Sequence, residues 1–153
     1  MKKYFFRYGV FIFLVFGLLT GCKENIDSVK NQSTSITKIS AKKSTNQSTA
    51  NHAKELVIKR DDVTGVRGVN TDKELLIAIT VPQIDRFQLK TIQKNVKEEL
   101  KKKYPDYKIE VSTDQKIFLE LDILERKLEE GKAGKKELKK EFGNIKRLMK
   151  EEA

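Results

Sequence analysis

The pattern of apolar and polar residues distinguishes a polar stretch at residues 23–51 from a following segment in which apolar residues are regularly spaced. Residues 23–51 consist mainly of Ser, Thr, Asn, Gln and Lys. Such a composition buries too little apolar surface to fold, so residues 22–51 are predicted to form a flexible linker. From residue 52 to residue 153, apolar side chains recur at the spacings of helices and strands. This segment has room for one small domain with a modest core.

Three strands are predicted within this domain. The clearest is residues 75–81, whose side chains are largely apolar on both faces, so it should lie in the centre of a sheet. Pro82 ends it, because proline cannot donate a backbone hydrogen bond to a neighbouring strand. A short irregular strand at residues 63–69 precedes it and should form a hairpin with it. Residues 107–111 alternate between apolar and charged side chains, which predicts a third strand with one face in water.

The first two predicted helices flank the hairpin. Residues 51–61 are assigned to a short helix, although Leu56-Val57-Ile58 suits a strand equally well. A second helix should begin at Asp85 and end near Lys103. Its start is predicted from two pairs, Asp85 with Gln88 at the spacing of a capping box and Ile84 with Leu89 at that of a hydrophobic staple.

Two more helices are predicted after the last strand. Residues 112–114 offer N-caps, apolar residues follow at helical spacing, and Gly131 marks the end. The final helix lies in residues 135–153 and is expected to fray, because Gly143-Asn144 interrupts it and two lysines open it at the positive end of the dipole. The element order predicts the α+β class, as a small two-layer sandwich with helices packed on one face of a three-stranded sheet.

The N-terminus has the layout of a secretory signal peptide. Residues 1–7 carry three basic side chains, and the apolar run at residues 8–19 is short for a membrane span, which needs about 20 apolar residues. The run ends in a sequence similar to a bacterial lipobox, namely Leu19, Thr20, Gly21 and Cys22. Residues 1–21 are therefore predicted to be cleaved off, and Cys22 to carry a diacylglyceryl group with fatty acids such as palmitate, with N-acylation as an option. The alternative is an uncleaved anchor that ends at Cys22, which would also tether the domain outside the membrane.

The chain is strongly basic. Its net charge is +10, from 32 Lys and Arg against 22 Asp and Glu, and removal of three basic signal residues leaves 29 − 22 = +7. A basic protein at a membrane is drawn to anionic headgroups, anionic wall polymers or nucleic acid, and export makes nucleic acid the least suitable of these. The second predicted helix presents a polar face that could bind an anionic surface, although a solvated face is the simpler explanation: Lys90, Lys94, Lys97, Lys101, Lys102 and Lys103.

The sequence offers little material for catalysis or metal binding. His52 is the only histidine and Cys22 the only cysteine, which excludes Ser-His-Asp and Cys-His arrangements within one chain and disfavours transition-metal sites. Asp61-Asp62 lacks the spaced loop of a calcium site, and Gly65-Val66-Arg67-Gly68 lacks the Lys-Ser/Thr of a phosphate-binding loop. Glu129-Glu130 alone indicates no sugar cleft. We therefore expect no enzyme, no metal and no cofactor apart from the lipid.

Several stretches of the domain are similar to one known family. They are Val63-Thr64-Gly65-Val66-Arg67-Gly68, Asp85-Arg86-Phe87, Tyr104-Pro105-Asp106-Tyr107 and Val111-Ser112-Thr113-Asp114-Gln115-Lys116-Ile117-Phe118-Leu119-Glu120-Leu121. Together with the lipobox, they resemble the YhcN/YlaJ family of small sporulation lipoproteins, and within it the YlaJ branch. The resemblance implies a fold similar to βαβ-type modules at bacterial envelopes. It also implies a lipoprotein on the outer face of a cell or spore membrane, with no catalytic residues to transfer.

Three functions are compatible with these observations. The leading hypothesis is a non-catalytic module in sporulation, germination or outgrowth, held to the membrane by its lipid and contacting envelope or germination proteins or peptidoglycan. The alternative is a general envelope module that binds peptidoglycan or anionic lipid through the lysine face of the second helix. An enzyme acting on the spore cortex rests only on location and scattered acidic residues.

Overall fold

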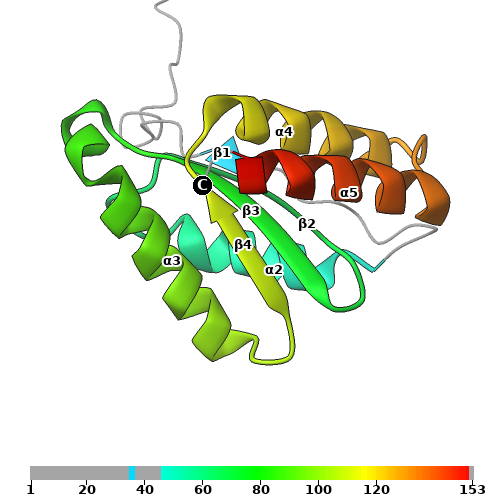
Figure 1. Cartoon of the computed structure of the whole chain (residues 1–153), viewed down its shortest axis with the longest axis horizontal. Coiled ribbons are helices and arrows are strands. Elements are labelled where there is room, and N and C mark those ends of the chain that lie inside the picture. Colours follow the sequence, from blue (N-terminus) through cyan, green and yellow to red (C-terminus); the bar gives the residue numbers. More distant parts are fainter. Residues whose placement is uncertain (1–34, 37–45, 152–153) are drawn as a thin grey trace, which may run out of the picture. The chain divides into compact units, whose positions relative to one another are not determined.

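The computed structural model describes residues 35–36 and 46–151, which form one mixed sheet with helices on both faces (Figure 1). The strands are β1 (Ser35–Ile36), β2 (Gly65–Asn70), β3 (Glu74–Thr80) and β4 (Lys108–Ser112), in the order β1-β2-β3-β4. Strands β2 and β3 form an antiparallel hairpin, and the two outer pairings are parallel. The helical segments are α2 (Ser48–Val57), the 3₁₀ helix η1 (Gln83–Gln88), α3 (Leu89–Lys103), α4 (Gln115–Glu129) and α5 (Lys135–Glu151).

The central strand β3 explains why the sheet is covered twice. Leu75, Ile77 and Ile79 project into a core formed with α2, α3 and β4, whereas Leu76 and Ala78 project into a second core formed with α4 and α5. Alternate residues of a strand point to opposite faces, so an apolar strand needs cover on both. The α+β class and the three predicted strands are confirmed, but the expectation of two layers with helices on one face is wrong.

The ordered domain begins earlier than the sequence indicated. Helix α2 starts at Ser48, and Gln47 before it is buried. The Gln47 side-chain amide donates to the Asn70 carbonyl oxygen at 2.8 Å and accepts from the Asn70 N–H at 2.9 Å. Ser35–Ile36 also pairs with β2, so two parts of the predicted linker belong to the fold. The rest of that linker, residues 22–34 and 37–45, lies outside the described residues.

The start of the second predicted helix is wrong in detail. Residues 83–88 form the 3₁₀ helix η1, and no side-chain hydrogen bond caps η1 or α3. Ile84 is 81% exposed, so it cannot act as a hydrophobic staple. Pro82 has an extended ψ of 152° and a carbonyl that accepts from the Asp85 N–H, which starts the tighter 3₁₀ turn in place of a capped α-helix.

The last two helices form a packed pair. Asp114 caps α4 by accepting from the N–H groups of Lys116 and Ile117 at 2.6 and 3.0 Å, and Gly131 ends the following turn with φ of 69°, as predicted. Helix α5 continues through residues 143–144 and buries its apolar stripe against α4. Gly143-Asn144 therefore does not interrupt the helix as expected, because tertiary packing offsets the weak helix propensity of glycine and asparagine.

Candidate functional site

The lysine face predicted from the sequence lies along α3 but does not form one surface. Five of its six lysines are exposed and Lys97 is half-buried. Lys102 and Lys103 line a groove between α2 and α3, whereas Lys97 and Lys101 line a second groove beside β4. Lys90 lines a third hollow at the start of α3, so the predicted lysines are divided among sites with different neighbours.

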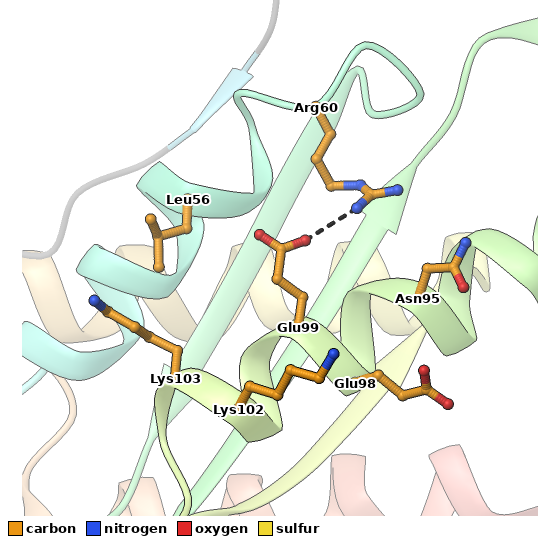
Figure 2. A pocket seen from close by; sticks show the side chains of 7 residues that line it. All are labelled: Leu56, Arg60, Asn95, Glu98, Glu99, Lys102 and Lys103. Atoms are coloured by element: carbon orange, nitrogen blue, oxygen red, sulfur yellow. Dashed lines mark hydrogen bonds and ion pairs between the residues drawn. The ribbon is translucent and has the colours of Figure 1, made fainter.

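The groove between α2 and α3 carries mixed charge (Figure 2). Arg60 donates to Glu99 at 3.0 Å and binds Asp62 through two hydrogen bonds at 2.7 and 2.8 Å. The hydrogen bond to Asp62, aided by the one to Glu99, raises the pKa of Arg60 above its ordinary value. Because its guanidinium is already held by two carboxylates, this groove offers little to an anionic ligand.

The groove beside β4, which we call the lysine groove, is lined by an excess of basic side chains. Helices α3 and α5 meet there with strands β3 and β4, and the four elements supply five lysines against two glutamates: Lys97, Lys101, Lys108, Lys146, Lys150, Glu74 and Glu110. Lys97 bonds to Glu110 at 2.6 Å, and Lys146 pairs with Glu74. The excess of positive charge in this concave site should raise the local concentration of anionic ligands.

Three lysines of this groove keep their charge uncompensated. Within residues 46–151, no ion pair joins Lys101, Lys108 or Lys150 to a carboxylate. They come from α3, β4 and α5, so their ammonium groups converge only in the folded chain. Lys97 and Lys101 were predicted from their helical spacing, but Lys108, Lys146 and Lys150 were not, because no periodicity along one element links them.

A buried group of charges closes the opposite side of the sheet. Lys54 of α2 and Glu125 of α4 are both 0% exposed, and their Nζ and Oε1 atoms lie 2.8 Å apart. The same Oε1 accepts the Gly68 N–H at 2.7 Å, and Arg67 lies 3.7 Å from Oε2 and 2.6 Å from Asp122. Strand β1 pairs only with the first two residues of β2, so Glu125 satisfies a backbone donor at the edge that β1 leaves open.

Desolvation acts against both charges of this pair. Burial raises the pKa of Glu125 and lowers the pKa of Lys54, and their mutual attraction opposes both shifts. Neither side chain reaches solvent, since both are fully buried. The arrangement therefore connects the helix layers on the two faces, and we assign it a structural role.

The other residues considered for chemistry are placed as follows. His52 is exposed, and its Nδ1 lies 2.9 Å from the Tyr104 hydroxyl. Asp62 is held by Arg60, and the hydrogen bond from Lys132 lowers the pKa of the exposed Glu130. Residues 65–68 belong to β2 and form no phosphate-binding loop. Within the described residues, no group of three or more His, Cys, Asp or Glu side chains could hold a metal ion.

The predicted lipidation site lies outside the described part of the chain. This applies to the signal peptide at residues 1–21 and to the lipobox residues Leu19, Thr20, Gly21 and Cys22. Among the helices that the structure does describe, none is long and apolar enough to cross a bilayer.

Comparison with known proteins identifies the family. Residues 23–150 match the model of the family described as sporulation lipoprotein YhcN/YlaJ. No curated protein and no solved structure gave a significant match. The matched region includes the whole sheet, the lysine groove and the buried charges. The chain therefore belongs to the YhcN/YlaJ family of sporulation lipoproteins.

Proposed function

We propose that this chain is a lipid-anchored, non-catalytic module that acts in sporulation, spore germination or outgrowth, on the outer face of a spore membrane or beside the cortex. The observation that carries the proposal is the family match over residues 23–150. The lipobox at residues 19–22 supports the anchor, since two acyl chains hold a protein stably at a membrane. In this proposal the chain needs no cofactor, and its partners are envelope or germination proteins or peptidoglycan.

The first experiment separates the anchor from the time of expression. Vegetative cells and purified spores are fractionated and probed for the full chain, with a fatty-acid label to report acylation. A Cys22→Ala chain is the control, because it removes the only thiol that can be acylated. We expect an acylated product in spore membranes and loss of the label in the Cys22→Ala chain. If the acylated product is found in growing cells but not in spores, the sporulation role is contradicted and the lipid anchor still stands.

A second function is favoured by the lysine groove. In this alternative, the chain is a general envelope module that binds peptidoglycan or anionic lipid through its basic surface. The five lysines of the groove favour it, together with the absence of ion pairs to three of them within residues 46–151. The binding surface is then the edge of β4 with the adjoining faces of α3 and α5, in place of the single α3 face expected from the sequence.

Salt dependence and charge removal test this alternative. The mature chain with Cys22→Ala is co-sedimented with anionic vesicles or with peptidoglycan at increasing ionic strength. We expect binding that weakens as salt rises, since a Debye length of about 10 Å at 0.1 M screens exposed charges. Lys108→Gln with Lys150→Gln should weaken binding more than the matched pair Lys102→Gln with Lys103→Gln. Equal losses from the two pairs would show that net charge alone matters, and the groove would be ruled out as a site.

A further inference from the structure

The segment between β3 and α3 exposes two large apolar side chains. Phe87 is 98% exposed and Ile84 is 81% exposed, and η1 buries no residue at all. Single exposed apolar residues are common, but neighbouring ones that form a contiguous apolar patch mark a surface that meets a partner or a membrane. Neither side chain contributes to the two cores or lines a described groove, so the fold itself gives them no role.

The 3₁₀ geometry brings the two side chains to one side. Three residues make one turn of a 3₁₀ helix, so side chains at positions i and i+3 eclipse each other. Ile84 and Phe87 have this spacing and therefore lie on the same side of η1, and we call them the apolar tip. Arg86 within η1 and Lys90 at the start of α3 are exposed beside them, and Asp85 is the acidic residue of the same turn. The tip is thus apolar at its end and mainly basic around it.

Strand register places this tip at the end of the sheet where the N-terminal segment enters. Ser35 is the partner of Gly65, and Gly65 is the partner of Thr80 at the end of β3. Val81 and Pro82 separate Thr80 from η1. The parallel pairing of β1 with β2 means that the chain reaches Ser35 from this same end, and Figure 1 shows β1 and the start of the α3 segment at the upper end of the sheet.

The length of the N-terminal segment keeps this end near the lipid. Cys22 and Ser35 are 35 − 22 = 13 residues apart. Thirteen residues reach at most about 45 Å even when fully extended. A domain held this closely samples the headgroups at high effective concentration, so even a small apolar contact can be populated.

We propose that Ile84 and Phe87 insert into the headgroup and upper acyl region of the bilayer that carries the lipid anchor, with Arg86 and Lys90 contacting lipid phosphates. This inference rests on the lipid anchor proposed above. The insertion fixes the orientation of the domain, with the η1 end toward the membrane and the β2–β3 turn away from it. A domain oriented in this way presents the far end of its sheet to partners in the surrounding envelope.

A single-tryptophan reporter tests the insertion. The chain contains no tryptophan, so in the Phe87→Trp variant all tryptophan fluorescence comes from position 87. The acylated full-length product is reconstituted into vesicles of phosphatidylcholine and phosphatidylglycerol, with and without lipids brominated near the glycerol. The matched control is Asp72→Trp, an exposed position in the β2–β3 turn at the opposite end of the sheet. We expect a blue-shifted emission and bromine quenching for Phe87→Trp, and neither for Asp72→Trp.

The outcomes distinguish failure of the lipid anchor from failure of the proposed insertion. If mass analysis shows acylation but the Phe87→Trp emission matches that of Asp72→Trp, the insertion is overturned while the anchor stands. A shift that appears only in spore membranes, and not in lipid vesicles, would assign the tip to a protein partner and also overturn the insertion. If the chain carries no acyl group, the anchor fails, and titrating vesicles into the same Phe87→Trp chain still reads whether the tip enters lipid.

Vesicle binding by substituted chains gives a second test of the insertion. In the mature Cys22→Ala chain, the double variant Ile84→Ser/Phe87→Ser should bind vesicles roughly tenfold more weakly or worse, since burial of one such side chain is worth more than a tenfold change in affinity. The control Ile123→Ser removes an exposed apolar side chain from α4 and should leave binding unchanged. Equal binding by the double variant and the unsubstituted chain would contradict the insertion.

Discussion

Removal of the buried ammonium of Lys54 should destabilise the fold in a pH-dependent way. Lys54→Met keeps most of the side-chain volume but leaves the carboxylate of Glu125 buried without the partner that lies 2.8 Å away. Breaking a buried pair by removal of one partner typically costs about 3–5 kcal/mol. Because Arg67 lies 3.7 Å from the other carboxylate oxygen and Gly68 still donates its N–H, we expect the lower end, about 3 kcal/mol at neutral pH.

The sign of the pH dependence follows from burial. Burial already raises the pKa of Glu125, and loss of the Lys54 charge, which opposes that shift, must raise the pKa further. A carboxyl group with a raised pKa binds its proton more tightly in the folded chain than in the unfolded chain, so stability increases as pH falls through that pKa toward the unfolded value. The penalty of Lys54→Met should therefore shrink in acid. Glu125→Gln leaves Lys54 charged and its pKa lowered, so its penalty should shrink as pH rises.

Urea unfolding of the mature chain with Cys22→Ala, followed by far-ultraviolet circular dichroism between about pH 4 and 9, measures these penalties. The double variant Lys54→Met/Glu125→Gln serves as the control, because it removes both charges and should recover most of the loss. A penalty under about 1 kcal/mol for Lys54→Met at neutral pH, or one that grows in acid, would refute the reasoning. Equal pH profiles for the two single variants would refute it as well.

The remaining predictions concern local backbone geometry and can be measured by the same unfolding assay. Gly68→Ala should lower the free energy of unfolding by about 1–3 kcal/mol, since its Cβ would lie 2.4 Å from an isoleucine side chain and 2.9 Å from a backbone oxygen of β3. An unchanged free energy would show that β2 shifts easily. Gly143→Ala should stabilise by about 0.5–1 kcal/mol, because no atom lies within 4 Å of the added Cβ in this helical position; destabilisation would mean that the glycine has a packing role. Asp114→Ala should cost about 1 kcal/mol through loss of the α4 cap, and an unchanged midpoint would mean that the two capping bonds add nothing.

The predictability of the fold differed between elements for physical reasons. The apolar side chains on both faces of β3 predicted that it lies inside the sheet, and Asp114 and Gly131 marked the limits of the α4 region. These signals depend on neighbouring residues alone. The start of α2 was missed because Gln47 and Ser48 look like linker residues. Gln47 is ordered by hydrogen bonds to Asn70, which is 23 positions later in the chain.

The candidate sites also combine features that local sequence patterns predict with features that depend on distant residues. The lysines of α3 were visible at helical spacing, but the lysine groove was not, since Lys108 and Lys150 join it from other elements. The pair of Lys54 and Glu125 spans 71 positions and could not be found from local pattern. Ile84 was interpreted as a staple because its spacing from Leu89 is correct, yet the 3₁₀ turn after Pro82 directs it to solvent.

The sequence by itself determined the α+β class, three of the four strands and the resemblance to the sporulation lipoproteins, because each of these depends on short-range periodicity or on contiguous motifs. It also predicts the lipobox at Cys22, whose chemistry needs no tertiary structure. Only the tertiary structure decided that helices cover both faces of the sheet, that three elements bring their lysines to the edge of β4, and that an apolar tip shares one end with the chain entry. The physical reason is that burial, charge clustering and exposure are properties of residues distant in sequence, and the free energy of packing sets them once the whole chain has folded.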